Sequence, residues 1–447
     1  MNDRNQARTA TDDNIIGSEF GLGLSGAIAL PSGLRPGIVI AATMDTKGEQ
    51  VDFLRAELEA RGVIVTVVDC GIRPAADHRI EIPADLVAQF AGSDIQSVRS
   101  WPERAPALAQ MLDGLEHCVR TLLGQGLITG FIGIGGGTNA ALAGRAFRVL
   151  PYGLPKILVS TAASGDTKPF IEGNDAVLIH PVVDFIGLNA PLRASLTRAA
   201  ATMVSMLPIS FWKGDEDLTI VGITAVGATT AAAEAAEGFF RGHGYGTYVF
   251  HARGPGGIAF EELIGQGRIT GAFDLATTEI SDEVLGGLRS AGPTRLEAAI
   301  KAGIPQVVIP GAVDLVNFGG IETVPDRYRN RQLITHTPAS TLLRISSDES
   351  RQVGAWMARK LVAARAPVSV FVPALGFSSY DRPGSIYRDE AASAAFVEGL
   401  TGGLKQRPDI EIQVLDLHIN DPRFVLSACE RMQTYLQTAK QQEKTNG

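Results

Sequence analysis

The chain has 447 residues, 45% of them hydrophobic, and a formal net charge of −8 at pH 7. Because this length exceeds what one hydrophobic core usually serves, we expect two domains. The acidic charge balance argues against a nucleic-acid partner, which would need a basic patch. The three cysteines lie far apart in the sequence, so we expect neither a disulfide framework nor a thiolate zinc site, which fits a cytoplasmic protein.

The start of the chain predicts a flexible arm over residues 1–35. This segment has no hydrophobic period, and its short glycine-rich apolar stretch predicts neither a secretory signal nor a membrane span. A continuous apolar run over 38–43 then predicts a strand that is buried on both faces of a parallel sheet. Apolar residues at helical spacing follow over 50–61, and a second strand over 63–69 completes a βαβ unit.

The same alternation of strands and helices continues through a first domain, 36–207. Residues 74–106 interrupt it as an insertion of mixed polarity that the second half of the chain lacks. The remaining predicted elements of this domain are helix 107–124, strand 128–134, a helix ending near 149, strand 156–160 and a closing helix 192–206. A linker is expected over 208–216.

A second domain, 217–432, repeats the plan of the first, and a charged tail follows over 433–447. Its predicted strands are 219–224, 246–251, 270–275, 305–310, 368–372 and 410–415, and its predicted helices are 230–242, 257–266, 294–302, 347–365 and 389–404. The Gly-Gln-Gly unit that begins at Gly124 also returns at Gly265. The sequence therefore predicts an α/β protein of two Rossmann-like three-layer domains with mainly parallel sheets, related by internal duplication.

The loops that follow strands in the first domain predict an anion site. Ligands of open parallel sheets bind outside the carboxyl ends of the strands. Glycines expose backbone N–H groups there, and helix N-termini add partial positive charge. The residues expected to bind a nucleotide or phosphate are Asp45, Thr46, Lys47, Gly48, Gly135, Gly136, Gly137, Thr138, Thr161, Ser164 and Gly165.

Two of these loops have alternative interpretations. The glycine loop that begins at Gly135 fits the pattern G-x-G-x-x-A, but no acidic residue follows about twenty residues later, as a dinucleotide site would need. A purely structural glycine turn is therefore the alternative to a phosphate-binding turn. Lys47 follows the first strand and is the best-placed cation for a phosphate, whereas the alternative is a lysine that reaches solvent. Asp45 could equally be only the N-cap of the following helix.

The strand-end loops of the second domain hold polar residues of a different kind. We expect His251, Glu279 and Asp314 to converge there, together with Asn317 and His336 from later loops. A histidine with two acids predicts a general-base set or a divalent-metal site, so these three are the candidate catalytic residues. The alternative is a hydrogen-bonded polar plug, because the spacings of short metal-ligand motifs are missing. No metal ligands are assigned.

These loops, in this order, resemble the Tm-one-like family, the two-domain proteins typified by the ATP-binding inhibitory domain of a tomato mosaic virus resistance protein. The matching segments are 43–48, 150–165, 183–189, 276–279, 286–287, 291–293, 314–319, 324–325, 331–336 and 373–378. The resemblance implies two Rossmann-like domains, bound ATP and a homodimer. It also implies a TIM-barrel partner protein, because bacterial members of the family lie beside one.

The glycine loop departs from the usual pattern of that family, which reads Gly-Gly-Ser-Gly-Gly-Thr. Gly137 stands where the family usually has serine, and Ala140 where it usually has threonine. In the second domain, Arg253 interrupts a run that usually reads His-Ala-Thr-Gly. Two hydroxyl donors are therefore lost from the glycine loop. Either ATP is held differently, or another anion has replaced it.

The sequence and the resemblance together predict a cytoplasmic ATP-binding protein. It would act on a small phosphorylated or carboxylated metabolite in the cleft between the domains, with Mg²⁺ as the divalent cation that accompanies ATP. Two alternatives stay open. One is an ATP-independent isomerase, lyase or hydrolase of a small acid, and the other is a non-catalytic regulatory or inhibitory binding protein. Whether the chain is an enzyme is left open, and neither a nucleic acid nor a membrane is expected as a partner.

Overall fold

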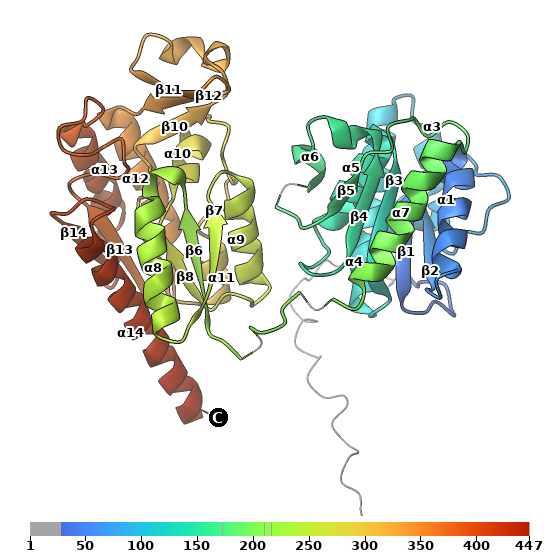
Figure 1. Cartoon of the computed structure of the whole chain (residues 1–447), viewed down its shortest axis with the longest axis horizontal. Coiled ribbons are helices and arrows are strands. Elements are labelled where there is room, and N and C mark those ends of the chain that lie inside the picture. Colours follow the sequence, from blue (N-terminus) through green and yellow to red (C-terminus); the bar gives the residue numbers. More distant parts are fainter. Residues whose placement is uncertain (1–27, 172, 210, 216, 447) are drawn as a thin grey trace, which may run out of the picture.

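The computed structural model describes residues 28–446 apart from 172, 210 and 216, and this part of the chain forms two α/β domains (Figure 1). The first domain contains a five-stranded parallel sheet in the order β2-β1-β3-β4-β5. Its strands are β1 (Gly37–Ala42), β2 (Val65–Asp69), β3 (Ile128–Gly135), β4 (Lys156–Ser160) and β5 (Val177–Ile179). Every residue of β1, β2 and β4 is buried, as expected of strands with helices on both faces.

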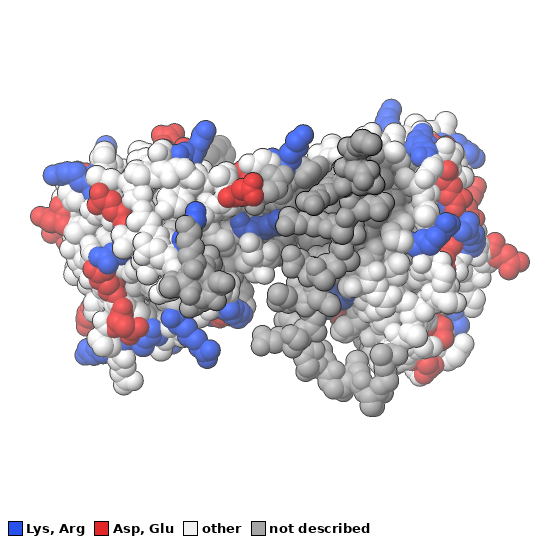
Figure 2. All heavy atoms as spheres, turned by 90° about the horizontal axis from the view of Figure 1, so that it is seen from below, with Lys and Arg blue, Asp and Glu red and all other residues white. Residues whose placement is uncertain are grey.

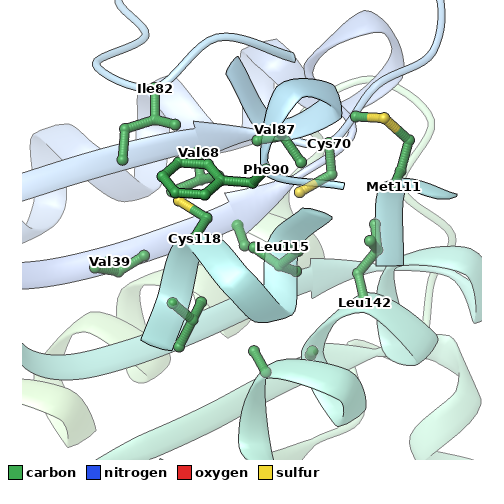
Figure 3. Packing of buried hydrophobic residues seen from close by; sticks show 14 of the residues in the cluster. Val39, Val68, Cys70, Ile82, Val87, Phe90, Met111, Leu115, Cys118 and Leu142 are labelled. Atoms are coloured by element: carbon green, nitrogen blue, oxygen red, sulfur yellow. The ribbon is translucent and has the colours of Figure 1, made fainter. Parts of the chain in front are cut away.

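Helices cover both faces of this sheet. They are α1 (Met44–Glu59), α2 (Ala84–Phe90), α3 (Ile95–Ser100), α4 (Arg104–Gly124), α5 (Gly137–Phe147), α6 (Lys168–Ile171) and α7 (Ala190–Met206). Apolar side chains of α1 and α7 share one buried cluster with the sheet. On the other face, Phe90 of α2 and Leu115 and Cys118 of α4 join Val39 and Val68 of the sheet in a second cluster (Figure 3). Burial of these two clusters is the main stabilising contribution to the domain.

The second domain contains a six-stranded parallel sheet in the order β14-β13-β9-β8-β6-β7. Its strands are β6 (Ile220–Ala225), β7 (Gly246–His251), β8 (Gly271–Asp274), β9 (Gln306–Val308), β13 (Val368–Pro373) and β14 (Glu411–Leu415). Helices α8 (Thr230–Gly242) and α14 (Pro422–Asn446) pack on one face. The helices of the other face are α9 (Pro255–Gly265), α10 (Thr278–Leu285), α11 (Ala298–Ala302), α12 (Ser347–Leu361) and α13 (Glu390–Gly403).

A small antiparallel sheet in the second domain is a feature that the sequence did not predict. Strands β10 (Leu315–Phe318), β11 (Leu333–Thr337) and β12 (Ser340–Arg344) pair in the order β10-β12-β11, between β9 and α12 in the chain. Helix α10 was also missed, because the segment was interpreted as a loop. Both elements lie beside the carboxyl ends of the main strands and shape the site described below.

The two domains share one strand order. Numbered within its own domain, each sheet begins 2-1-3-4-5, and the second domain adds a sixth strand. The prediction of two α/β domains with mainly parallel sheets is confirmed, and the common order agrees with an internal duplication. In sheets of this order the connections reverse direction between strands 1 and 3, and ligands bind at that switch point. The switch points lie between β1 and β3 and between β6 and β8.

The two ends of the chain differ in how much the structure describes. Of the predicted arm, residues 1–27 lie outside the described part, while Ile28, Leu30 and Leu34 pack against the core of the first domain. At the other end, α14 runs past residue 432 as one helix, and its Leu436 is buried. None of the described helices is long and apolar enough to cross a membrane. Basic and acidic side chains are interspersed on the face shown in Figure 2.

Candidate functional site

In the first domain, Asn139 of α5 ties together the loops after β1 and β3. Its Oδ1 accepts from the backbone N–H of Thr43 at 2.9 Å, and its Nδ2 donates to the hydroxyl of Thr43 at 3.1 Å. Gly135 makes this approach sterically feasible. It has a φ of +137°, and a Cβ there would lie 2.6 Å from the amide nitrogen of Asn139. The glycine at the start of the loop is therefore structural.

We expect Gly135→Ala to lower the free energy of unfolding of the first domain by about 2 kcal/mol, because alanine would be strained at this φ and would clash with Asn139. Gly137→Ala is the matched control, since nothing lies within 4 Å of the position that its Cβ would take. Urea unfolding of both variants measures the difference. Equal stabilities would contradict the structural role of Gly135.

The N-termini of α1 and α5 lie at this switch point, and the first N–H group of α1 already has an acceptor, because the N–H of Met44 donates to Oδ1 of Asp69 at 3.0 Å. Helix α1 begins after Thr43 and α5 after Gly136, and neither of these residues caps its helix through a side chain. The first N–H groups of a helix carry partial positive charge and lack acceptors within the helix. An anion at this point would supply acceptors for the first N–H groups of α5.

A cavity of about 410 Å³ opens beside these helix ends, and we call it the first-domain cavity. Thr43, Asp45, Thr46 and Thr138 line one side of it, and Arg73, Arg99, Trp101, Glu103 and Arg104 line the other. Arg104 donates to the hydroxyl of Thr138 at 3.2 Å, and Arg73 pairs with Asp45 at 3.3 Å. Three arginines against two acids leave the described lining with a net positive charge.

The structure brings only some of the predicted first-domain residues to this cavity. Asp45, Thr46 and Thr138 line it, but Lys47 points away and its Nζ donates to the carbonyl of Phe185 at 3.3 Å. Gly48 packs under the ring of His78. The loop after β4, with Thr161, Ser164 and Gly165, and the glycines Gly135, Gly136 and Gly137 lie outside the lining. The N-cap of α1 is Thr43, not Asp45.

The arginines were missed because they belong to the 74–106 insertion and its flank, which carried no assigned role. The signal was present, since Arg99, Trp101 and Arg104 cluster within six positions of an acidic chain. In the structure α3 and the start of α4 fold this segment over the carboxyl end of the sheet. The insertion is therefore a wall of the cavity.

In the second domain, the structure separates the three candidate catalytic residues. His251 lies at the end of β7 and lines a cavity of about 290 Å³ with Asn317 and His336, which we call the second-domain cavity. Glu279 and Asp314 are fully buried and lie outside that lining. Contrary to the prediction, His251 therefore does not converge with the carboxylates of Glu279 and Asp314 in this cavity.

Both buried carboxylates belong to internal networks. Glu279 accepts from the N–H groups of Gly254 and Gly257 at 2.6 and 3.0 Å and from Arg295 at 2.9 Å. Burial raises its pKa, and the charge of Arg295 opposes the shift. Asp314 accepts from the hydroxyl of Ser378 at 2.8 Å, and burial raises its pKa to about 6. These contacts fit the polar-plug alternative. No group of three or more His, Cys, Asp or Glu suited to a metal occurs among the described residues.

A third cavity, of about 650 Å³, lies between the domains, where a metabolite was expected. First-domain residues such as Tyr152 and Asn174 line it together with second-domain residues such as Phe250 and Leu263. Its walls are mainly apolar, and the charged residues of its described lining are one lysine and two aspartates. This composition is less suited to an anionic metabolite than that of the other two cavities.

Two doubly wound α/β domains, each with a cavity at the carboxyl end of its sheet, define a two-domain Rossmann-like protein. Models of the N- and C-terminal domains of the uncharacterised protein family UPF0261 match residues 36–210 and 219–436. The chain belongs to this family.

Relatives of the chain occur in bacteria and in a plant. A UPF0261 protein of Clostridium tetani is 36% identical over 88% of this chain and 98% of its own length. The tomato ToMV resistance protein Tm-1(GCR237) is 35% identical over 87% of this chain, but the match covers 54% of the plant protein. The resemblance that the loops indicated is confirmed as to family. A solved glycosyltransferase, SnogD from Streptomyces nogalater, matches 90% of this chain and 99% of its own at 11% identity with a TM-score of 0.17, which is too low to bear on function.

Proposed function

We propose that the first-domain cavity binds a nucleoside phosphate, and that this ligand is ATP. The chain would be a cytoplasmic metabolic enzyme that uses the nucleotide on a small phosphorylated or carboxylated metabolite. The observation that carries the proposal is the meeting of the N-terminus of α5, which Gly136 leaves without a side-chain cap, with Arg73, Arg99 and Arg104 at the switch point of the sheet.

Each part of a nucleotide has a matching part of the cavity. Phosphate oxygens can accept from the first N–H groups of α5, from the threonine hydroxyls and from Arg104. The ring of Trp101 is 36% exposed, so one of its faces can stack on a base. The volume of about 410 Å³ falls in the usual range for small-molecule sites.

Mg²⁺ fits the same cavity because of Asp45. The Oδ1 atom of this carboxylate is buried and has no hydrogen-bond partner among the described residues, although the side chain lines the cavity. Mg²⁺ is usually held by one or two carboxylates together with substrate phosphates. Bound Mg²⁺ would offset the repulsion between Asp45 and a phosphate chain. We therefore expect ATP to bind more weakly without Mg²⁺, and Asp45→Asn to reduce this dependence.

Replacing Arg104 by alanine is expected to weaken the binding of Mg-ATP by roughly 10- to 100-fold, because a charge-assisted hydrogen bond is lost. Isothermal titration calorimetry measures the change. Arg120→Ala on the same helix is the matched control, since Arg120 is exposed and pairs with Glu116. Lys47→Ala is also expected to leave the affinity unchanged. The proposal fails if millimolar Mg-ATP neither releases heat nor shifts the melting temperature of the wild-type chain.

A non-catalytic binding or regulatory role is the second candidate function. It is favoured by the tomato relatives, which are named for resistance or susceptibility to ToMV. The two candidates differ in turnover. A regulatory protein would bind ATP and leave it intact in the presence of small acids and phosphates, whereas the enzyme would release ADP or AMP with at least one of them.

A further inference from the structure

The second-domain cavity has an unusual balance of charge. Its described lining contains two arginines, Arg253 and Arg289, and two histidines, His251 and His336, but no aspartate or glutamate. The chain as a whole carries a formal charge of −8. A cavity of such composition in an acidic protein is electrostatically complementary to an anion.

The two arginines lack acidic partners. Within the described residues, the guanidinium of Arg253 makes no hydrogen bond or ion pair, and Arg289 bonds only to neutral groups, the amide oxygen of Asn317 and the hydroxyl of Ser340. Burial and the charge of Arg253 lower the pKa of Arg289 to about 10, and the charge of Asp282, which does not bond to the guanidinium, opposes the shift. The cavity lining offers neither guanidinium group a carboxylate to bond with, which leaves room for a ligand carboxylate or phosphate that each arginine can bind through two parallel hydrogen bonds.

A buried network holds Arg289 in place. Asp282 accepts from both the backbone N–H and the Nδ2 of Asn317, each at 2.7 Å. With its amide N–H₂ engaged in this way, Asn317 turns its oxygen toward Arg289. Asn317 thus holds Arg289 in place and is itself held by Asp282. Both residues are buried, as expected of a preformed binding site.

The rest of the cavity suits the uncharged part of a small acid. The hydroxyl of Tyr380 bonds to Nδ1 of His336 at 2.9 Å. Burial and the two arginines lower the pKa of His251, so its imidazole is neutral at pH 7 and offers a lone pair to a ligand hydroxyl. The volume of about 290 Å³ is at the small end for ligand cavities, so it suits an acid of a few carbon atoms rather than a nucleotide.

We propose that the second-domain cavity binds a small metabolite through its carboxylate or phosphate group, with Arg253 and Arg289 as the anion ligands and His251 against its neighbouring polar group. This site is separate from the first-domain cavity and does not depend on nucleotide binding. It places the small acid within the second domain, not in the apolar space between the domains.

Hydrogen exchange of the full chain with inorganic phosphate or with malonate as probe tests the proposal. At millimolar concentration one of the two probes should protect the segments around 251–257 and 286–293, and the more effective probe identifies the preferred anion. Arg253→Ala should raise the apparent dissociation constant roughly tenfold or more. Arg253 has no side-chain partner among the described residues, so this variant should fold. Arg289→Lys is a second variant, which keeps the positive charge but loses the bidentate hydrogen bonding of the guanidinium group.

Arg104→Ala separates this proposal from nucleotide binding. This variant should lose affinity for Mg-ATP while phosphate or malonate still protects the second domain as in the wild type. The proposal is overturned if neither probe protects these segments, or if Arg253→Ala responds to the probes as the wild type does.

Discussion

Replacement of Arg295 by methionine is expected to destabilise the second domain by about 3–5 kcal/mol, the usual cost of removing one partner from a buried ion pair. The Arg295 side chain is completely buried, and it forms ion pairs with three carboxylates. It bonds to both oxygens of Asp274 at 2.5 and 2.7 Å, to Glu279 at 2.9 Å and to Glu261 at 3.0 Å. Without it these carboxylates would face one another in the interior.

Urea unfolding followed by hydrogen exchange in β8 and α10 measures the loss for this domain. Arg241→Met is the matched control, because Arg241 is 70% exposed and its ion pair is with Glu237 one turn away, and such pairs contribute little. The loss in Arg295→Met should shrink at pH 5, because burial raises the pKa values of Glu261 and Glu279 and these two side chains can take up protons. A loss below about 1 kcal/mol at neutral pH would show that the carboxylates are compensated in another way.

The alternation of strands and helices was predictable because buried parallel strands and amphipathic helices have distinct periods. The directions in which individual side chains point at the strand ends were harder to predict from the sequence. Asp45 and Lys47 were both expected at the anion site, yet residues two apart on a helix point about 200° apart. Helix α1 therefore turns Asp45 toward the cavity and Lys47 toward Phe185. The helix was predicted only from residue 50 onward, whereas α1 begins at Met44, so the helical phase was not applied to these two residues.

The roles of Glu279 and Asp314 could not be predicted by the same reasoning. Both follow strands, as site residues do, but their partners come from distant positions such as Arg295 and Ser378. Which carboxylate is paired inside the protein depends on packing that a single sequence does not reveal. His251 bonds to the backbone of Ala225 and lines the second-domain cavity. The small sheet β10-β12-β11 supplies Asn317 and His336 to that cavity, so missing this sheet also concealed the site.

The stability of the second domain is expected to fall as the pH rises from 5 to 8, by on the order of 3 kcal/mol. Burial raises the pKa of Asp282 from its ordinary 3.8 to about 7, and hydrogen bonds from Asn317 oppose the shift. A carboxyl with a raised pKa in the folded state contributes stability that is fully present below its unfolded pKa and is lost as the pH rises through its folded pKa. Asp314, with a pKa raised to about 6, acts in the same direction. The lowered pKa of His251 acts in the opposite direction, but this side chain is only partly buried, so its effect is smaller.

Unfolding free energies measured in urea at several pH values give the slope that tests this expectation. Asp282→Asn removes one titrating group, so the slope near pH 6 should become smaller by up to about 1.4 kcal/mol per pH unit, whatever the variant loses in absolute stability. Asp348→Asn is the control, because Asp348 is 87% exposed and should leave the slope unchanged. A wild-type profile that is flat or rises over this range would mean that Asp282 is already ionised at pH 5. Asn317 and Arg289 would then stabilise the carboxylate more than burial destabilises it, and the arginine of the second-domain cavity would carry a fixed buried counter-charge behind it.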